Sequence, residues 1–509
     1  MEQVQTRWNG WGVPGHDDPL AVNEPAWRWL AQAFAMPALL ATPPRELSAI
    51  ALPPSRLSEQ ARGRLTGLLG HVEQSNLERA RHAAGRTLTD LLKLRAGDLS
   101  AAPDAILYPR RESEVLAALK LCAELGIAVV PWGGGTGQLT LARGGHSALV
   151  VLNLSEINRF KTPDMMSGLV EVEAGVTGPD LERPLKAHGM MLGHRPDDFE
   201  FSTLGGWIAC ASRAVPDWLH SLRVATPLGM IVSGGALNAI MTGSQGAFGV
   251  ITGATLRIRA LPKKEEHRAY LFPDFASGLA AMHQAQRLGL PNIFLRLSDD
   301  GETRFDQALE KADREWNLPD HMFEIYLSIR RFGGSAVRLT AGFSGDAQDV
   351  SAERRYFDGL ARRAGALALG VDEKTAKRRF LSGYRRDTLL DRGVGIDSLE
   401  VFATWAKLPA LYVAVRAALK QAMRNHAPRS GAHGLVLCHV GAARPDGAVL
   451  TFTWLFPRIL DDAITQARNI RQAAQAAAPS DDNNELEQDI RRSIKRVLDP
   501  SAILSPGKP

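Results

Sequence analysis

The residues best placed for chemistry form a glycine-rich turn directly after an apolar run. Residues 126–130, Gly-Ile-Ala-Val-Val, are followed by Pro-Trp-Gly-Gly-Gly-Thr-Gly at residues 131–137. Consecutive glycines allow positive φ angles and let main-chain N–H groups converge on an anion such as a phosphate. A glycine triplet after a strand is also common as a simple turn, so the loop by itself leaves both interpretations open.

Further glycine- or hydroxyl-bearing turns follow this loop. They are Glu-Val-Glu-Ala-Gly-Val at 171–176, Arg-Pro-Asp-Asp at 195–198, Phe-Ser-Thr-Leu-Gly-Gly at 201–206 and Gly-Ser-Gln-Gly-Ala-Phe-Gly-Val-Ile-Thr at 243–252. Together their backbone donors and hydroxyls could face one elongated, phosphate-containing ligand. A dinucleotide site of the Gly-x-Gly-x-x-Gly type is not favoured, because the glycine spacing differs and no acidic residue about 20 positions later ends a second strand.

The elements that must position these turns alternate along the chain. From residue 104, short β-branched runs predict strands at 106–108, 127–130, 148–154 and 169–176, with a helix at 112–125. A second series predicts strands at 268–272, 293–297, 323–329 and 336–343, with helices at 275–288 and 349–364. We therefore predict an α+β protein, divided into a helical segment at 1–100, a two-subdomain ligand-binding module at 101–262, a sheet-and-helix cap domain at 263–445, and a strand and helices at 446–509 that return to the module.

Composition restricts the function classes. The 509 residues are 45% hydrophobic and 23% charged, which is typical of a soluble globular chain with more than one core. A formal net charge of +5 is small for this length, so it indicates no nucleic-acid role, whereas an anionic small molecule remains compatible. Because no apolar leader and no run of about 18 apolar residues is seen, we expect a cytoplasmic protein.

Cysteine usage and one apolar segment complete this picture. Cys122, Cys210 and Cys438 lie far apart without metal-ligand spacing, so we expect buried, reduced thiols and no metal site. Any peripheral membrane contact would involve residues 27–40, where apolar residues dominate. A helix packed against the rest of the protein is the favoured interpretation of that segment.

These motifs resemble the FAD-binding flavoproteins of the vanillyl-alcohol-oxidase/p-cresol-methylhydroxylase superfamily, and within it the alkyldihydroxyacetonephosphate synthases. Beyond the glycine loop, the similarity rests on Trp-Asn-Gly-Trp-Gly at 8–12, Leu-Leu-Lys-Leu-Arg at 91–95, Glu-Phe-Ser-Thr-Leu-Gly-Gly-Trp at 200–207 and Leu-Arg-Leu-Ser-Asp at 295–299. It runs over most of the chain. It implies an FAD-binding module at 101–262 and a substrate-binding cap domain at 263–445.

The resemblance also implies where FAD would bind, with its pyrophosphate on the glycine loop and its isoalloxazine near residues 202–206. The cofactor-binding residues would be Pro131, Gly133, Gly134, Gly135, Thr136, Gly137, Asp197, Ser202, Thr203, Gly205, Gly206, Gly249, Val250 and Ile251. Superfamily members that attach FAD covalently usually carry a His or Cys in or just after the glycine loop. This chain has Thr136 and Gln138 there, so we predict non-covalent FAD.

Two residues are candidates for catalysis. Arg296 matches the arginine that lies near the substrate side of the flavin in the similar synthases, and its guanidinium suits a carboxylate or phosphate. An arginine in a structural salt bridge is the alternative. His439 lies on a predicted strand, where it could line the site or be a hydrogen-bonded core histidine.

The chain departs from the synthase pattern at its C-terminal end. Thr451 occupies the place of the family's catalytic tyrosine, and Ala-Ala-Pro-Ser-Asp-Asp-Asn-Asn-Glu at 477–485 replaces its histidine run. A threonine hydroxyl cannot replace a phenol with a pKa of about 10 in acid–base work. The segment at 210–220 is also shorter than in the family, and Gln245 and Ala247 replace an acid and a threonine.

Two hypotheses follow. In the first, the chain is an FAD-dependent enzyme that acts on an anionic, lipid-like or 2-hydroxy-acid substrate by flavin redox or flavin-adduct chemistry, as a homodimer or with a partner subunit. In the second, it is a catalytically degenerate paralogue that serves as a non-catalytic partner or scaffold. The missing tyrosine and histidines argue against the synthase reaction, and they do not argue against the fold.

Overall fold

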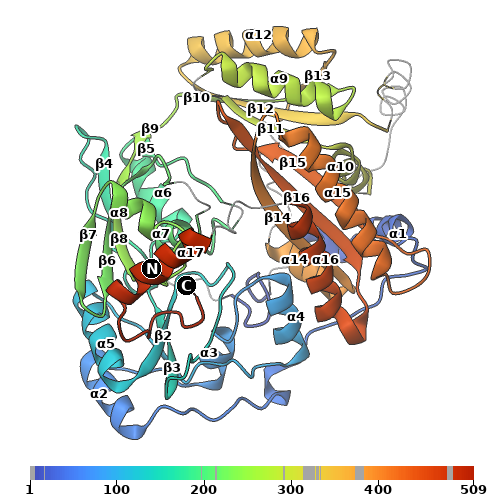
Figure 1. The fold of residues 1–509 in the computed structure, drawn as a ribbon. Coiled ribbons are helices and arrows are strands. Elements are labelled where there is room, and N and C mark those ends of the chain that lie inside the picture. Colours follow the sequence, from blue (N-terminus) through green and yellow to red (C-terminus); the bar gives the residue numbers. More distant parts are fainter. Residues whose placement is uncertain are drawn as a thin grey trace. The chain divides into compact units, whose positions relative to one another are not determined.

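The computed structural model describes residues 6–15, 18–196, 198–211, 215–290, 293–312, 327, 332, 334–372, 383–478 and 485–508. The chain divides into two compact units (Figure 1). Unit 1 comprises Met1–His16, Pro44–Leu261 and Ser480–Pro509, and unit 2 comprises Asp17–Pro43 and Pro262–Pro479. The expected strand 323–329 lies outside the described residues apart from Leu327.

Unit 1 is built on two main sheets. The parallel sheet has the order β1-β3-β2, the antiparallel sheet has the order β4-β8-β6-β7, and β5 pairs with β9. The strands are β1 (Ala105–Leu107), β2 (Ile127–Trp132), β3 (Ala148–Asn153), β4 (Leu169–Glu173), β5 (Met190–Met191), β6 (Leu219–Thr226), β7 (Gly229–Ser233), β8 (Val250–Arg257) and β9 (Arg259–Ala260). One continuous apolar core joins both sheets, as expected for a two-subdomain module.

The described helices of unit 1 pack around these sheets. They are α2 (Glu59–Leu69), α3 (Asn76–Arg81), α4 (Leu88–Ala96), α5 (Glu112–Leu125), α6 (Gly178–Ala187), α7 (Leu204–Cys210), α8 (Ala236–Met241) and α17 (Glu485–Leu498), with a 3-10 turn η2 (Leu47–Ala49). Helix α5 matches the range expected from sequence. Acidic Glu112 and Glu114 begin it, and Gly126 ends it in the left-handed conformation at φ 62°.

Unit 2 is built on one seven-stranded antiparallel sheet with the order β13-β10-β12-β11-β15-β16-β14. The strands are β10 (Lys264–Phe272), β11 (Ile293–Ser298), β12 (Val337–Gly345), β13 (Leu367–Val371), β14 (Val394–Thr404), β15 (Leu435–Gly441) and β16 (Gly447–Pro457). Strand β16 pairs with β14 and β15 over most of its length. Residues 446–479 therefore lie in unit 2, which differs from the expectation that everything after residue 445 returns to the ligand-binding module.

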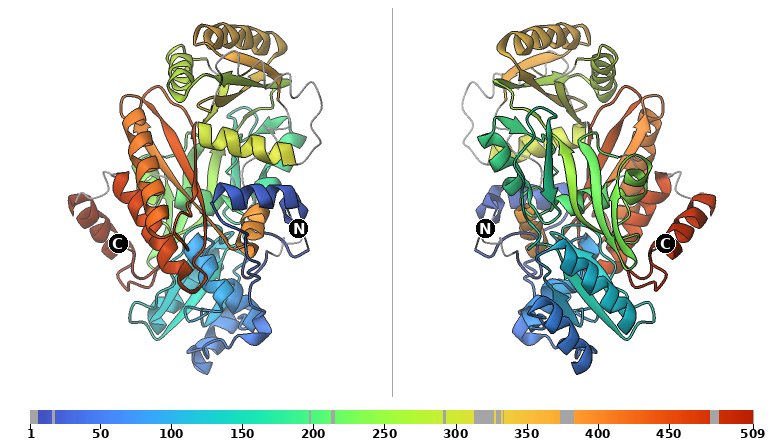
Figure 2. Two further views of the ribbon diagram at one scale, coloured as in Figure 1. Left: turned by 90° about the vertical axis from the view of Figure 1, so that its right-hand side faces the viewer. Right: turned by 90° about the vertical axis from the view of Figure 1, so that its left-hand side faces the viewer.

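Helices pack against both faces of this sheet. The described helices of unit 2 are α1 (Glu24–Ala33), α9 (Phe275–Arg287), α10 (Asp300–Ala312), α12 (Ala347–Arg363), α14 (Gly383–Asp391), α15 (Leu408–Asn425) and α16 (Ala463–Ala477), with 3-10 turns η1 (Pro19–Val22) and η3 (Leu460–Asp462). Helices α15 and α16 lie side by side along the strands (Figure 2). Tyr270 of β10 packs on Phe357 of α12, and Phe452 of β16 packs on Tyr412 of α15. Residues 270, 297, 440 and 450 of neighbouring strands lie on one face of the sheet, so α12 and α15 pack against the same face.

Helix α1 resolves the question about residues 27–40. Trp27, Leu30 and Phe34 are buried in a core cluster that also contains Phe305 and Leu455 of unit 2. The interpretation as a packed helix is confirmed for these side chains, whereas Leu40 at the end of the segment is 60% exposed. Among the helices described, none has the length and hydropathy needed to cross a membrane.

The cysteines differ in exposure. Cys122 and Cys438 are buried, as expected, because they lie on the core-facing sides of α5 and β15. The expectation of a buried thiol is wrong for Cys210, which is exposed at the last residue of the short helix α7.

Candidate functional site

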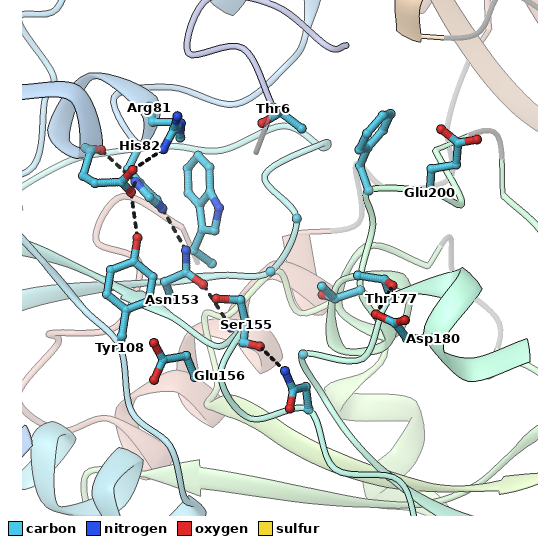
Figure 3. Close-up of a pocket in the computed structure, with 18 of the residues that line it drawn as sticks. Thr6, Arg81, His82, Tyr108, Asn153, Ser155, Glu156, Thr177, Asp180 and Glu200 are labelled. Atoms are coloured by element: carbon cyan, nitrogen blue, oxygen red, sulfur yellow. Dashed lines mark hydrogen bonds and ion pairs between the residues drawn. The ribbon is translucent and has the colours of Figure 1, made fainter. Parts of the chain in front are cut away.

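A polar cavity of about 720 Å³ opens in unit 1 at the ends of several strands. Tyr108 follows β1, Trp132 and Gly133 end β2 and begin the glycine loop, and Asn153 ends β3 (Figure 3). The opposite wall contains Gly175, Thr177, Asp180, Glu200, Phe201 and Thr203. Its volume falls in the range of small-molecule and cofactor sites.

The glycine loop is packed tightly against the segment that precedes α7. A Cβ added to Gly133 would lie 2.3 Å from Thr203 Oγ1, and one added to Gly134 would lie 2.0 Å from the Phe201 carbonyl oxygen. At Gly135, with φ +68°, a Cβ would lie 2.1 Å from the Trp132 ring. The glycines are thus required by close approach of protein to protein as well as by the left-handed turn.

The loop has the donors that a pyrophosphate needs. Within the described part of the chain, the main-chain N–H groups of residues 134–137 donate no hydrogen bond to another protein group. Polar main-chain groups left without a protein acceptor in a partly buried turn fit an anionic ligand. The residues present therefore fit an FAD pyrophosphate on the loop.

A second motif, at residues 8–12, is linked to this loop by hydrogen bonds of Arg86. The Arg86 guanidinium donates to the carbonyl oxygen of Gly10 at 2.8 Å, and Trp11 Nε1 donates to the Arg86 carbonyl at 2.9 Å. The Arg86 main-chain N–H donates to the Gly137 carbonyl at 3.2 Å. The Trp-Asn-Gly-Trp-Gly motif at 8–12 is thereby linked to the end of the glycine loop.

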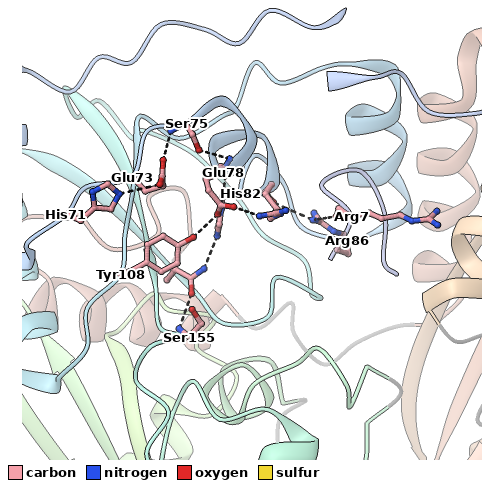
Figure 4. Close-up of polar contacts among 11 residues, drawn as sticks. Arg7, His71, Glu73, Ser75, Glu78, His82, Arg86, Tyr108 and Ser155 are labelled. Carbon is pink, nitrogen blue, oxygen red and sulfur yellow. Dashed lines mark hydrogen bonds and ion pairs between the residues drawn. The ribbon is translucent and has the colours of Figure 1, made fainter. Parts of the chain in front are cut away.

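A network of polar side chains forms one end of the cavity (Figure 4). Tyr108 donates to Glu78 Oε2 at 2.7 Å, and Glu78 also pairs with Arg81. Buried His82 contacts the Glu78 carbonyl through Nδ1 at 2.8 Å and Asn153 Nδ2 through Nε2 at 2.9 Å. Since the Asn153 amide donates, Nε2 must accept and Nδ1 must carry the proton. Burial lowers the pKa of His82 to about 4, so this histidine is neutral near pH 7.

The structure distributes the expected cofactor residues around this cavity. Gly133, Gly134 and Thr203 line it, while Pro131, Gly135, Thr136 and Gly137 belong to the same loop. Asp197 lies outside the described residues.

The remaining expected cofactor residues belong to α7 and to the start of β8. Ser202 donates to the Asp198 carbonyl and accepts from Trp207 Nε1, and Thr203 Oγ1 caps α7 by accepting from the Gly206 N–H. Gly205 packs on Ala174, and Gly249, Val250 and Ile251 lie where β8 pairs with β6. Val250 and Ile251 are buried in the core, so only their main chain could reach a cofactor.

Sequence reasoning missed several lining residues. Tyr108 and Asn153 were placed in expected strands without a role in the site, and His82 and Ser155 were not singled out. Asn153 carried the available signal, because it is a polar residue that ends the apolar run of β3. His82 carried none, since nothing in its local sequence places it next to a residue 71 positions away.

A buried ionic cluster in unit 2 contains both expected catalytic residues. Arg296 on β11 donates to Ser298 Oγ at 3.0 Å, to Glu302 Oε1 at 3.0 Å and to His439 Nδ1 on β15 at 2.8 Å. The structural salt bridge expected as the alternative for Arg296 is therefore present. Because a guanidinium can only donate, His439 Nδ1 accepts, and the ring proton lies on Nε2.

Two carboxylates of α10 set the electrostatics of this cluster. Glu302 is almost fully buried, and among the described residues its Oε2 has no hydrogen-bond partner. Burial raises the pKa of Glu302, but the charges of Arg296 and His439 and the hydrogen bonds of His439 and Ser298 together outweigh it, and the pKa falls to about 2. Burial and then the charge of Glu302 raise the pKa of Asp306 to about 7. The pair thus holds one carboxylate and one group that titrates near neutrality.

The strand register explains what stands in place of the missing tyrosine. His439 lies directly opposite Thr451 of β16, and Thr451 lies opposite Glu400 of β14. These residues share the sheet face that carries Arg296, which is the face opposite α9, α12, α15 and α16. Directly paired side chains of one face are about 5 Å apart at Cβ, so His439 is a neighbour of Thr451, where the resemblance would place the family's tyrosine.

An apolar row lies next to this polar row on the same face. Phe402, two residues after Glu400, belongs to this row and is 46% exposed, and Phe294, two residues before Arg296 on β11, is 47% exposed one row further along the sheet. Val449 lies between Phe402 and Gly441 in the ladder. The face therefore offers a cation and an imidazole beside exposed apolar side chains.

Comparisons with known proteins define the class. Residues 103–235 match the family described as FAD binding domain, and residues 261–477 match the C-terminal domain of FAD linked oxidases. A p-cresol methylhydroxylase structure with substrate bound has the same fold, with a TM-score of 0.65 and 14% identity over 90% of this chain and 98% of that chain. The chain belongs to the FAD-binding proteins that combine this FAD binding domain with the C-terminal domain of FAD linked oxidases.

Within this class, the chain is a flavoenzyme similar to alkyldihydroxyacetonephosphate synthases. The synthase of Dictyostelium discoideum is 30% identical over 405 residues, which are 75% of this chain and 66% of that protein. The synthase of Trypanosoma brucei brucei is 25% identical over 99% of this chain and 92% of its own length. A solved alkyldihydroxyacetonephosphate synthase matches with a TM-score of 0.84 and 26% identity over 99% of this chain and 98% of that chain.

A second kind of relative shares a shorter region. A mitochondrial D-lactate dehydrogenase (cytochrome) of Saccharomyces cerevisiae is 27% identical over 43% of this chain and 41% of its own length. The resemblance to FAD-dependent enzymes read from the sequence is thereby confirmed, and nothing favours a non-catalytic scaffold.

Proposed function

We propose that this flavoenzyme acts on an amphiphilic anion, a molecule with a phosphate or carboxylate head and an alkyl tail. The observation that carries the proposal is that Arg296 and His439, beside Glu302 of α10, share one sheet face of unit 2 with the exposed side chains of Phe294 and Phe402. The carboxylate of a small 2-hydroxy acid such as D-lactate would pair with the cation, but such a molecule has no alkyl tail to contact the apolar row. The similarity to alkyldihydroxyacetonephosphate synthases supports the same choice.

FAD supplies two-electron redox or electrophilic chemistry when it is bound. The residues that would hold it are the main-chain amides of 134–137, with Gly133 and Thr203 beside them. Non-covalent binding is supported by Thr136 and Gln138, which offer neither a thiol nor an imidazole. Cys210 is the thiol to control for, because its Sγ lies 3.6 Å from where a Cβ on Gly137 would be.

The attachment can be tested directly. We expect acid precipitation of the purified protein to release all the yellow flavin into the supernatant, for the wild type and for Cys210→Ser alike. Flavin that stays with the wild-type precipitate and is lost from Cys210→Ser would contradict non-covalent binding and identify the attachment residue.

The residues of unit 2 would bind and orient the substrate. Arg296 would hold the anionic head through charge-assisted hydrogen bonds, while Glu302 fixes the direction of the guanidinium. His439 keeps its Nε2–H for a second partner, because Nδ1 is engaged by Arg296. We propose that His439 moves the proton that the tyrosine would move in the family pattern, from the position next to Thr451.

Chain-length dependence of binding tests the substrate class. With the FAD-loaded protein and a series of alkyl phosphates, calorimetry should show affinity that rises by up to about 0.8 kcal/mol per added methylene until the apolar row is covered. Phe402→Ala should flatten this rise and leave the shortest homologue unaffected. The charge-neutral variant Arg296→Met/Glu302→Gln should lose affinity for every homologue.

Two results would overturn this assignment. If affinity does not change with chain length, the apolar row is not a substrate surface. If D-lactate bleaches the flavin absorbance and no alkyl phosphate competes with it, the protein is a hydroxy-acid dehydrogenase.

A further inference from the structure

The motif Leu-Arg-Leu-Ser-Asp at 295–299 ends in an aspartate to which the proposed function gives no role. Asp299 lies between the last residue of β11 and the first residue of α10, and its side chain is fully buried. Because side chains alternate along a strand, it leaves the chain on the sheet face opposite Arg296, where it contacts Tyr412 of α15. Any effect of Asp299 on a ligand held by Arg296 must therefore pass through other groups.

The side chain of Asp299 extends a short ladder between β11 and β15. Among the described residues this ladder comprises two pairs, Leu297 with Val440 and Ser298 with His439. At the next step the Asp299 main-chain N–H donates to the Cys438 carbonyl oxygen at 2.7 Å. The return bond from the Cys438 N–H goes to Asp299 Oδ1 at 3.1 Å, because the Asp299 carbonyl accepts the Thr303 N–H of α10. The carboxylate thus replaces a main-chain acceptor where the strand gives way to the helix.

The same carboxylate oxygen holds the first turn of α10. The Glu302 N–H donates to Asp299 Oδ1 at 2.8 Å, which is the bond of a helix N-cap. One oxygen therefore fixes the main chain of Glu302 and of Cys438, the residue before His439. The Arg296 guanidinium depends on these two segments, since it donates to Glu302 Oε1 at 3.0 Å and to His439 Nδ1 at 2.8 Å.

The direction of the carboxylate is fixed from α15. Asp299 Oδ2 accepts the Tyr412 hydroxyl at 3.1 Å and lies 3.8 Å from Arg416 Nε. Burial and the charges of Glu302 and Asp300 raise the pKa of Asp299, the Glu302 N–H bond and the charge of Arg416 lower it, and the resulting pKa is about 6. The carboxylate is therefore ionised near pH 7, and an ionised acceptor forms the stronger, charge-assisted hydrogen bonds.

We propose that Asp299 is a positioning residue of the anion site, which aligns Arg296 with His439 by holding α10 and β15 together at the end of β11. The inference rests on the proposed function for the identity of the ligand, whereas the alignment is a property of the free protein. Without an acceptor at Oδ1, two buried main-chain N–H groups lose their partner, and nothing fixes the last step of the short ladder. Glu302 and His439 would then shift relative to each other, and the guanidinium would lose its fixed direction.

Three substitutions of Asp299 separate the acceptor oxygen from the charge. Asp299→Ala removes the acceptor, whereas Asp299→Asn keeps a carbonyl oxygen for both N–H groups and turns an amide donor toward Tyr412. Asp299→Ser keeps an N-cap acceptor for α10, so it guards against an Asp299→Ala protein that does not fold. The serine side chain is one bond shorter, so it does not reach the Cys438 N–H as well.

Calorimetry with octyl phosphate and the full-length, FAD-loaded protein measures the effect on the anion site. We expect Asp299→Ala to weaken binding by about 10-fold or more, because the guanidinium is no longer held in the productive direction. Asp299→Ser should weaken binding in the same direction. Asp299→Asn should stay within about 3-fold of the wild type, because its oxygen still accepts both N–H groups.

The ring of His439 gives a second measurement that needs no ligand. In nitrogen NMR of protein labelled at histidine, the His439 signal is assigned by its loss in His439→Gln. The wild type should show an unprotonated Nδ1 and a protonated Nε2 in the neutral ring. Asp299→Ala and Asp299→Ser should shift this signal toward a mixture of the two tautomers, because Nδ1 loses its donor, and Asp299→Asn should not. A merely structural role would lower the melting temperature and leave the tautomer unchanged.

Asp274→Ala is the matched control. Asp274 caps α9, a helix on the same sheet, and its carboxylate accepts the Ser277 N–H at 2.8 Å. This variant makes the same substitution at a helix N-cap, so it should lower the melting temperature. It should leave the affinity for octyl phosphate and the His439 signal unchanged. Circular dichroism checks that each variant is folded.

Three results would overturn the proposal. One is a His439 signal that is the same in Asp299→Ser, Asp299→Ala and the wild type. Another is a wild type that binds octyl phosphate no more tightly than Asp299→Ala does. The third is an Asp299→Asn protein that binds as weakly as Asp299→Ala, because this would assign the effect to charge. If the His439 signal responds as expected and no form binds octyl phosphate, the positioning role stands and the proposed substrate class fails.

Discussion

Truncation of Arg296 to alanine should destabilise unit 2 far more than loss of a surface arginine would. The substitution removes the guanidinium that lies 3.0 Å from Glu302 Oε1 and leaves the Glu302 carboxylate in a site where its side chain is 2% exposed. It also removes the donor to His439 Nδ1. An unpaired buried charge has lost its hydration and has no ion pair to compensate for that loss.

The size of this change follows from the loss of a buried ion pair. Removal of one partner from such a pair typically costs about 3–5 kcal/mol. The pKa of Glu302, which lies at about 2 and so below its ordinary value, shows in the same direction that the folded site favours the charged form. For a unit of this size, such a loss lowers the melting temperature by on the order of 10 °C.

Urea unfolding of a double-mutant cycle measures the effect. The variants are Arg296→Ala, Glu302→Gln and their combination, followed by tryptophan fluorescence at pH 7. We expect Arg296→Ala to lose about 3 kcal/mol or more, and the double variant to recover most of that loss because no charge is left buried. Arg304→Ala is the matched control, since Arg304 is 57% exposed in its pair with Asp300 and should lose less than about 1 kcal/mol. An Arg296→Ala protein within 1 kcal/mol of the wild type, or a double variant no better than the single one, would refute this reasoning.

Three further outcomes are expected. Gly134→Ala should cost about 1–3 kcal/mol in stability and weaken FAD binding in a fluorescence titration, because the new Cβ meets the Phe201 carbonyl at 2.0 Å, whereas Gly67→Ala, which meets nothing within 4 Å, should be tolerated. Burial and the Glu302 charge keep Asp306 protonated in the folded state between about pH 4 and pH 7. The free energy of unfolding should therefore fall by on the order of 1 kcal/mol per pH unit as the pH rises through that window. In urea unfolding curves, Asp306→Asn should flatten this slope. Buried His82 stays neutral down to about pH 4, whereas the same histidine in the unfolded chain binds a proton below about pH 6.5. The free energy of unfolding should therefore fall as the pH decreases across that interval. A thermal melting series in which His82→Gln keeps the wild-type slope would contradict the assignment.

Local pattern was sufficient for the elements and for the cofactor loop. The expected helix 112–125 and the strands around residues 106, 127, 148 and 169 appear within a few residues of their expected bounds, because amphipathic period, glycine ends and β-branched runs are properties of short windows. The loop at 131–137 could be found for the same reason. Its physical basis was incompletely foreseen, since the glycines also admit residues 201–203, which are distant in sequence.

Contacts across the sheet could not be read from the chain. Arg296 and His439 were each singled out, but their hydrogen bond joins positions 143 residues apart, and only the strand order β11-β15-β16 brings them together. The same register places His439 opposite Thr451, which turns an apparent loss of acid–base chemistry into a proposal for its replacement. A strand's neighbours are decided by which pairing buries the most apolar surface, and that choice involves the whole chain.

The amino-acid sequence by itself determined the class of this protein, its FAD-binding loop and the alternation of its helices and strands, because these depend on residue types at short spacing. The tertiary structure alone decided that β16 completes the sheet of unit 2, that Trp27 and Phe34 are core residues, and that His82, Tyr108 and Asn153 share one cavity. The physical reason is that burial and pairing are collective: a side chain's surroundings are set by strands and helices that the sequence places far from it.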